Sequence, residues 1–172
     1  MSDYAKGGND TFRGASSSTN TAYGDAGGDM SDHSKGGDDI FAGPFSGNTF
    51  YGDAGGNMSD HAQGGDDTFT GGSVKAGDTF CGDAGGDMSD YAEGGNDTFT
   101  GSGDQSGKNF YGDAGGNMSG HAQGGDDTFT GADGDFFVEN HFDGDAKSIS
   151  ESAKEVTTLL PAVTPPARLL TG

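Results

Sequence analysis

Branched aliphatic residues are scarce in this sequence. Trp is absent, and Leu, Ile, Val and Phe together number 22 of 172 residues, with Phe supplying twelve of them. Before residue 135 there is one Ile, one Val and no Leu. A charged chain with less than roughly a fifth of these residues is usually disordered, because the apolar surface it buries cannot offset the chain entropy it loses. Either a small aromatic core forms with help from outside the chain, or the chain does not fold.

Cysteine and long apolar runs are also nearly absent. Cys81 is the single cysteine, so no internal disulfide forms, and cysteine usage does not separate reducing from oxidising compartments. No apolar run approaches the roughly 18 residues that span a bilayer, and the N-terminus lacks the segments of a cleavable signal peptide. We expect any export from the cell to use another route.

Positive charge is scarce as well. Residues 1–145 hold 24 Asp and two Glu against five Lys and Arg, whereas the last 27 residues are close to neutral. Such a surface disfavours nucleic acid and anionic membranes as partners and favours cations. Because Asp outnumbers Glu so strongly, the composition indicates a preference for a short carboxylate close to the backbone, which is typical of a ligand.

What the sequence has is a repeat. The segment MSDHAQGGDDTFTG at residues 58–71 recurs from Met1, Met30, Met88 and Met118, and successive copies stand 29, 28, 30 and 30 residues apart. Each repeat contains three segments. One carries GGND or GGDD before a Phe, a looser one leads to Gly-Asp-Ala, and the third is GDAGGD or GDAGGN before Met. A fixed period of this length predicts a solenoid.

The spacing also predicts a coil with glycine corners. Paired glycines allow a tight turn, and a stretch such as Asp-Thr-Phe alternates between outside and inside as a short strand. Stacked strands lie about 4.8 Å apart. Aspartates repeated at that distance repel by about 1 kcal/mol per neighbour in water and by more where water is excluded. A divalent cation between successive corners reverses the sign of that interaction.

These residues resemble a known family. GGNDTF and GDAGGD are similar to the nonapeptide GGxGxDxUx of the RTX, or haemolysin-type, calcium-binding repeats, in which U is a large apolar residue. The resemblance covers residues 1–137 and implies an all-β parallel β-roll with calcium between adjacent coils, bound by Asp side chains and Gly carbonyls. Carried over, the implied aspartates are Asp10, Asp39, Asp67, Asp97 and Asp127, with looser matches at Asp29, Asp78 and Asp87. The implied glycines are Gly8, Gly37, Gly65, Gly95 and Gly125.

The sequence departs from the family pattern in two ways. The first two glycines of the nonapeptide are replaced by pairs such as Ala-Lys, and in the looser segment Lys108 stands at the Asp place, so we expect some corners without metal. Three segments per repeat also conflict with the family's two units per coil. Two units would place identical segments on opposite sides of alternate coils, whereas a coil of about 29 residues would stack like on like. The resemblance favours the two-unit coil.

Other recurring side chains have rival interpretations. His33, His61 and His121 suggest zinc or a catalytic base, but Tyr4 and Tyr91 fill the same place, which favours a ladder of flat rings. Cys81 stands where other copies have Tyr, and no catalytic set of Ser, His and Asp stands out, so we do not expect an enzyme.

A threonine row is a further alternative. Thr11, Thr68, Thr98 and Thr128 suggest an outward row of the kind that binds ice in some solenoids. Ile40 interrupts this row, and the sequence shows no second row on the neighbouring face.

The pattern dissolves near residue 137, so residues 138–172 are predicted to form a C-terminal cap or tail. Phe136, Phe137 and Val138 fit a capping strand, residues 146–160 have helical apolar spacing, and prolines follow. The RTX resemblance implies an uncleaved signal for type I secretion machinery in such a tail, while a linker to a missing domain is an equal alternative.

We therefore expect a secreted, extracellular protein that binds several calcium ions and folds on binding them. Two alternatives stay open: an adhesive module that binds a polysaccharide or other surface ligand through the Tyr and His ladder, and the calcium-binding tail of a larger toxin or enzyme.

Overall fold

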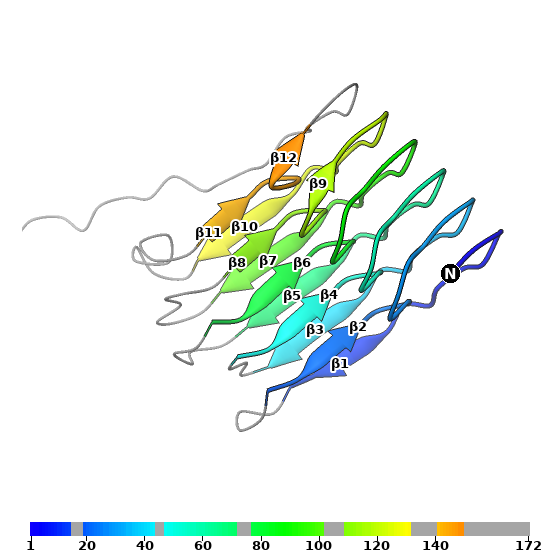
Figure 1. The fold of residues 1–172 in the computed structure, drawn as a ribbon. Helices are drawn as coiled ribbons and strands as arrows, with labels where there is room; N and C mark the ends of the chain where they lie inside the picture. Colours follow the sequence, from blue (N-terminus) through cyan, green and yellow to red (C-terminus); the bar gives the residue numbers. More distant parts are fainter. Residues whose placement is uncertain (15–18, 44–46, 72–76, 102–108, 132–140, 150–172) are drawn as a thin grey trace, which may run out of the picture.

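The chain forms a parallel β-solenoid, which confirms the predicted all-β fold class. The computed structural model describes residues 1–14, 19–43, 47–71, 77–101, 109–131 and 141–149. These residues wind through successive coils that stack along one axis (Figure 1). They form strands and turns without a helix. In this part of the chain we find no helical segment with the length and apolarity to cross a bilayer.

Two five-stranded parallel sheets face each other across each coil, and a short two-stranded sheet lies at the third side. The first sheet contains β1 (Thr11–Arg13), β3 (Ile40–Gly43), β5 (Thr68–Gly71), β7 (Thr98–Gly101) and β10 (Thr128–Gly131). The second contains β2 (Thr21–Tyr23), β4 (Thr49–Tyr51), β6 (Thr79–Cys81), β8 (Asn109–Tyr111) and β11 (His141–Asp143). The two-stranded sheet contains β9 (Asn117–Met118) and β12 (Ser148–Ile149).

One sequence repeat makes one coil, so the expected two-unit coil is wrong. Phe12 pairs with Phe41, and Phe69 pairs with Phe99, each one repeat further along the chain. Isolated bridges outside the named strands continue the same register, as between Ala54 and Ala84. Stacking identical residues is favoured because aromatic rings meet aromatic rings and glycines meet glycines at every level.

The core consists of two sets of stacked side chains. Between the sheets, the Phe rings of the first sheet stack with centroids 4.7–4.8 Å apart. Phe50, Phe80 and Phe110 of the second sheet pack against them. A second core holds fully buried methionines, whose direction the sequence did not determine, packed with a row of alanines. The buried methionines are Met30, Met58, Met88 and Met118.

Differences in repeat length fall in one connection. In each repeat a Phe stands eleven positions after the Met, as Phe41 does after Met30. The connection from the first sheet to the second varies in length: Phe50 stands nine positions after Phe41, whereas Phe80 stands eleven positions after Phe69. Coils of unequal length therefore keep a common register in the parts that carry core and glycine corners.

The stack continues beyond residue 137. β11 pairs with β8, and β12 pairs with β9, so residues 141–143 complete the fifth level of the second sheet and residues 148–149 extend the third side. HFDGDA at 141–146 matches NFYGDA at 109–114, and this signal was missed. Ser148 and Ile149 are strand residues, so the helix predicted from residue 146 is wrong at its start, because ladder pairing outweighs a local helical spacing. The predicted capping residues Phe136, Phe137 and Val138 lie outside the described residues.

Filling the first coil should stabilise the protein. Ala22 stands where the following coils have Phe, and a hollow of about 520 Å³ opens there beside Phe12 and Phe50. We expect Ala22→Phe to raise the free energy of unfolding by about 1–2 kcal/mol, because the added ring stacks on Phe50 and loses contact with water. Thermal unfolding followed by circular dichroism measures this. Ala42→Phe, on the outer side of β3, is the control, and an equal or lower melting temperature for Ala22→Phe than for the unaltered chain contradicts the packing argument.

Candidate metal centre

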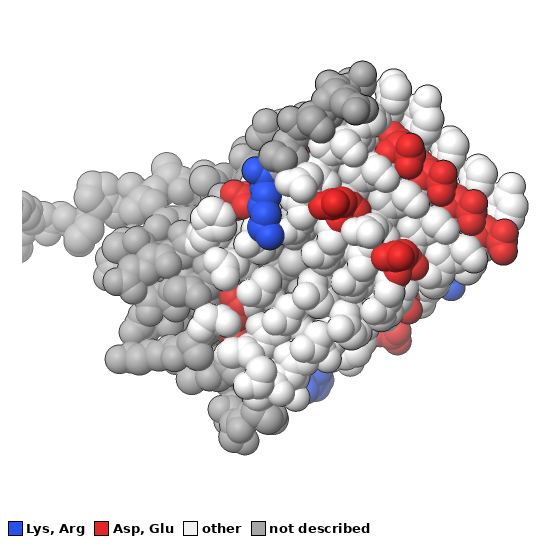
Figure 2. All heavy atoms as spheres, in the orientation of Figure 1, with Lys and Arg blue, Asp and Glu red and all other residues white. Residues whose placement is uncertain are grey.

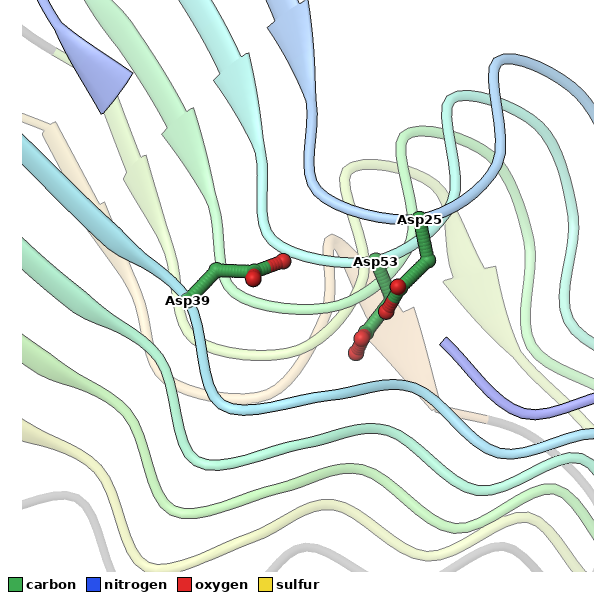
Figure 3. A group of neighbouring side chains, drawn as sticks. All are labelled: Asp25, Asp39 and Asp53. Atoms are coloured by element: carbon green, nitrogen blue, oxygen red, sulfur yellow. The ribbon is translucent and has the colours of Figure 1, made fainter. Parts of the chain in front are cut away.

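Two rows of aspartates face each other inside one corner of the solenoid. The GGxD row precedes the strands of the first sheet, and the GDA row follows those of the second sheet. Figure 3 shows this for Asp39, which points from its segment toward Asp25 and Asp53 of the two neighbouring coils. The GGxD row is Asp39, Asp67, Asp97 and Asp127, with the exposed Asp10 at its start. The GDA row is Asp25, Asp53, Asp83, Asp113 and Asp145.

Backbone amides fix the carboxylates of the GGxD row. The Asp39 N–H donates to Asp67 Oδ1 at 2.6 Å, and the Asp67 N–H donates to Asp97 Oδ1 at 2.7 Å. The Asp97 N–H donates to Asp127 Oδ1 at 2.9 Å. Each aspartate thus holds its successor one coil along, and one oxygen of each carboxylate is occupied by this bond.

Glycine amides fix the GDA row in a similar way. The Gly37 N–H donates to Asp25 Oδ2 at 2.7 Å, and the Gly65 N–H donates to Asp53 Oδ2 at 2.9 Å. The Gly125 N–H donates to Asp113 Oδ1 at 2.8 Å. These glycines are therefore part of the site through their N–H groups.

The remaining oxygens of the buried aspartates converge without donors. Among the described residues, no donor reaches one oxygen of each of these side chains: Asp39, Asp53, Asp67, Asp97, Asp113 and Asp127. Three groups each place three oxygens within 4.8 Å of one another. They are Asp25, Asp39 and Asp53; then Asp53, Asp67 and Asp83; then Asp113, Asp127 and Asp145. Ionised carboxylates cannot be held this way without protons or a cation between them, because burial and mutual repulsion both disfavour the charged form.

The pKa values of these carboxyl groups express the same conflict. Burial raises the pKa of Asp39 to about 7 and that of Asp127 to about 8. Burial, followed by the charge of Asp53, raises the pKa of Asp67 to about 10. The pKa values of Asp53, Asp83, Asp97 and Asp113 also lie well above the ordinary value, with burial as the largest cause. In the absence of a cation, the folded state therefore retains protons at neutral pH.

Glycine is required next to both rows. A Cβ at Gly94 would lie 1.8 Å from Asp113 Oδ1, and a Cβ at Gly82 would lie 1.7 Å from Asp97 Oδ2. The same clash recurs at the equivalent corners of other coils. Glycine before each aspartate is thus a matter of space for the carboxylates, and it explains why GG and GDA recur together.

Four of the predicted aspartates occupy this site. Asp39, Asp67 and Asp127 belong to the clusters, and Asp97 continues their row, where the charges of Asp67 and Asp127 act on its carboxyl group. Asp10 begins the row at the exposed end, and its N–H donates to Asp39 Oδ1. The predicted glycines line the same corner. A Cβ at Gly95 would lie 1.8 Å from the carbonyl oxygen of Gly65, so these carbonyls face the glycine of the next coil.

Three predicted aspartates lie elsewhere. Asp29 and Asp87 are exposed and form a row with Asn57 and Asn117, whose backbone N–H groups they bind at 2.8 Å. Asp78 is buried, but it precedes β6, at the opposite end of the strand from Asp83, and its Oδ1 accepts the Asn48 N–H. The three clusters do not include these residues.

The whole GDA row was missed as a ligand set. The signal was present, because Gly-Asp-Ala recurs without variation in every copy of its segment. Matching to the nonapeptide assigned the corner to the GGxD aspartates alone. Only a coil of one full repeat brings the two rows together, so the choice of the two-unit coil concealed the second row.

The other recurring side chains have structural roles. The predicted ring ladder is confirmed, because its rings stack with centroids 4.8–5.2 Å apart. Its members are Tyr4, His33, His61, Tyr91 and His121. Cys81 is buried, and burial raises the pKa of its thiol to about 12, so it is not an activated nucleophile. Exposed acids also follow the repeat, and Figure 2 shows such acidic side chains in a row along one edge of the surface.

Comparison with protein-family models, with curated proteins and with solved structures finds no match to this chain. The site is therefore interpreted from its own residues.

Without divalent cations, the fold should lose stability as the pH rises. The folded pKa values lie above those of the unfolded chain, so the native state binds more protons, and stability falls with pH. The contribution is fully present below about pH 4 and is lost as the pH rises through the folded values, from about 7 at Asp39 to about 10 at Asp67. Melting temperatures in chelator between pH 4 and pH 10 measure this, and a rise over that range contradicts it. Asp87→Asn, at an exposed position, should leave the slope unchanged.

Two glycine substitutions test whether the crowded corner, and not the general effect of replacing glycine, determines the loss of stability. Gly94→Ala should abolish folding or lower the free energy of unfolding by several kcal/mol, because the new methyl group occupies the place of the Asp113 carboxylate. Gly28→Ala is the control, since a Cβ added there would have no atom within 4 Å. Chemical denaturation compares the two variants. Equal loss of stability in both variants is the result that contradicts the crowded corner.

Proposed function

We propose that this protein binds calcium in the corner between the GGxD and GDA rows and that binding drives its folding. The observation that carries this is the convergence of buried carboxylate oxygens that lack donors among the described residues. In the three clusters, carboxylates from adjacent coils approach within 4.8 Å, and each oxygen without a donor belongs to a carboxylate whose other oxygen accepts a backbone N–H. A cation is the simplest species that satisfies such oxygens at neutral pH.

The donor set favours calcium over other metals. All candidate ligands in the three clusters are aspartate oxygens, which suit hard cations, whereas zinc and copper favour imidazole or thiolate. Three of the four histidines belong to the exposed ring ladder on another part of the coil, and the exposed His141 on β11 contacts Asp143, which is in none of the clusters. Magnesium keeps several waters and demands octahedral geometry, while calcium accepts flexible sets of carboxylates. Buried aspartates contributed by three segments fit the second description better.

Coupling to folding follows from the net charge and from the small core. The formal net charge is −20, and apolar side chains are few, so the chain without cations gains little from collapse and repels itself. A ligand that binds only the native state adds its binding free energy to stability. Cations bound along the rows would offset the cost of burying the carboxylates, which is several kcal/mol per ion when no partner is present.

The resemblance to RTX repeats supports a role outside the cell. Low calcium inside a cell would keep the chain unfolded, and millimolar calcium outside would fold it, which suits type I secretion. The one-repeat coil and the glycine N–H contacts differ from what that resemblance implied, so the proposal is calcium-dependent folding in a secreted RTX-like protein, with a structural role and not a catalytic one.

A polysaccharide-binding role has less support from the geometry. Sugars stack on the open faces of aromatic rings, but the rings of the ladder cover one another, with interplanar angles of 2–19°. Only ring edges remain along most of the ladder.

Asp67→Asn tests one of the three clusters with one atom exchanged. Asp67 Oδ1 accepts the Asp39 N–H and can still do so as an amide oxygen, while the amide nitrogen replaces the oxygen without a donor. We expect the calcium concentration at the folding midpoint to rise about tenfold, equivalent to about 1.4 kcal/mol. In chelator the same variant should be as stable as the unaltered chain or more stable, because a buried amide needs neither a counter-charge nor a bound proton.

The measurement is far-ultraviolet circular dichroism during titration from chelator to about 10 mM calcium, with magnesium as the ionic control. Asp87→Asn is the matched variant, because the equivalent coils already carry Asn57 and Asn117. β-structure that forms in chelator to the same extent at neutral pH, or equal midpoint shifts in both variants, would falsify the proposed site.

A further inference from the structure

The outer face of the first sheet carries three files of polar side chains in register. Because side chains alternate along a strand, residues 66, 68 and 70 face outward while Asp67 and Phe69 are buried. The pairing of β5, β7 and β10 repeats this pattern directly. One file is Asp66, Asn96 and Asp126; the next is Thr68, Thr98 and Thr128; the third is Thr70, Thr100 and Thr130.

The third file was not recognised from the sequence. The sequence shows no second threonine row on the neighbouring face, but one stands on the same strands, two residues along. Ile40 and Ala42 occupy the two threonine places on β3, and Arg13 follows Thr11 on β1. All three files are therefore complete only over β5, β7 and β10, and we call this part of the face the lattice.

The face is flat and evenly spaced. The Phe rings directly beneath it are stacked 4.7–4.8 Å apart with interplanar angles of 3–7°, so successive strands are related almost by pure translation. Most sheets twist by roughly 20° or more per strand. Along each strand, outward residues lie roughly 6.6 Å apart, which leaves space for one file of water between the two threonine files.

The polar groups of this face are fixed in place. Asp66 Oδ1 accepts the Asn96 N–H at 2.8 Å, and Asn96 Oδ1 accepts the Asp126 N–H at 2.7 Å. Threonine is β-branched and has few side-chain rotamers on a strand. The threonines are exposed or half-buried, so their methyl and hydroxyl groups reach solvent.

A translationally repeated surface is matched by a ligand with the same repeat. The strand repeat of 4.7–4.8 Å lies within several per cent of the shortest lattice repeat of hexagonal ice, and hydroxyl groups substitute for water in hydrogen bonding. The second sheet lacks such a lattice, because Tyr51 and Tyr111, with the buried Cys81 between them, stand at the strand position that the third file occupies on the first sheet.

We propose that the outer face over β5, β7 and β10 is an ice-binding surface. It holds ordered water in positions close to those of the crystal, so that the protein adsorbs to ice and slows its growth. This function is separate from cation binding, which occurs inside the solenoid, but it needs the folded state.

Ice-crystal shape and thermal hysteresis of the full chain in calcium test this directly, after circular dichroism has shown that the sample is folded. Faceted crystals and a measurable hysteresis gap are expected, with albumin at equal mass as the blank. A sample that is folded but gives round crystals and no gap overturns the ice proposal and leaves the calcium proposal intact. A sample that does not fold in calcium at any concentration overturns the calcium proposal, and the ice test is then made on protein folded at about pH 4, where protons replace cations.

Two substitutions locate the surface. Thr98→Tyr places a bulky ring at the centre of the lattice and should reduce the hysteresis to the level of albumin. If this variant folds poorly, Thr70→Tyr makes the same test at an exposed position. Thr79→Tyr on β6 makes the same exchange on the opposite sheet and should retain full activity. Equal loss from the substitutions on both sheets, or no loss from those on the first, contradicts the assignment.

Discussion

In-register parallel stacking is the constraint on which the rest of this structure depends. The strands and bridges of one coil lie over their counterparts one repeat away, so each favourable or unfavourable contact between them is multiplied along the axis. For Phe, Met and Ala this multiplication builds a continuous core from very few apolar residues. For Asp it builds a row of like charges inside the protein. The same register therefore creates both the stability and the main threat to it.

Glycine and the cation resolve that conflict at different levels. Glycines beside Asp97 and Asp113 provide the space in which carboxylates of adjacent coils can approach, and glycine amides donate to the carboxylates of the GDA row from Asp25 to Asp113. This arrangement brings the carboxylates of the two rows together but does not neutralise them. Protons neutralise them at low pH, and we propose that calcium does so at neutral pH. The repeated geometry of the corner thus makes folding conditional on the solvent rather than on the chain alone.

The repeat, the fold class and the GGxD aspartates of the corner could be predicted from the sequence because each is a local pattern: a period, an alternation, and an aspartate after two glycines. Which segments meet across the coil could not be predicted in this way. It depends on whether two or three segments close one turn, a long-range property that the spacing of Asp39 or Asp53 does not report. With two segments in each turn, the prediction gave the GDA row no facing row of aspartates. The strand at residues 141–143, which completes the fifth level of the second sheet, was missed for a different reason, since HFDGDA at 141–146 has diverged in its flanks while keeping the residues that pair.

A five-residue segment shows how closely the properties of this fold are coupled. In residues 66–70, Asp67 faces the metal centre, Phe69 faces the core, and Asp66, Thr68 and Thr70 face the solvent. Strand alternation separates these chemistries by a single residue, so the cation rows and the outer lattice share the same spacing by construction. The regularity of the outer face therefore depends on the stacking within: whatever holds Asp67, Asp97 and Asp127 in line also keeps Thr68, Thr98 and Thr128 in line. A surface that recognises a periodic ligand thus requires the interior cation rows to be satisfied, which links the two proposed functions through the backbone rather than through contact between the sites.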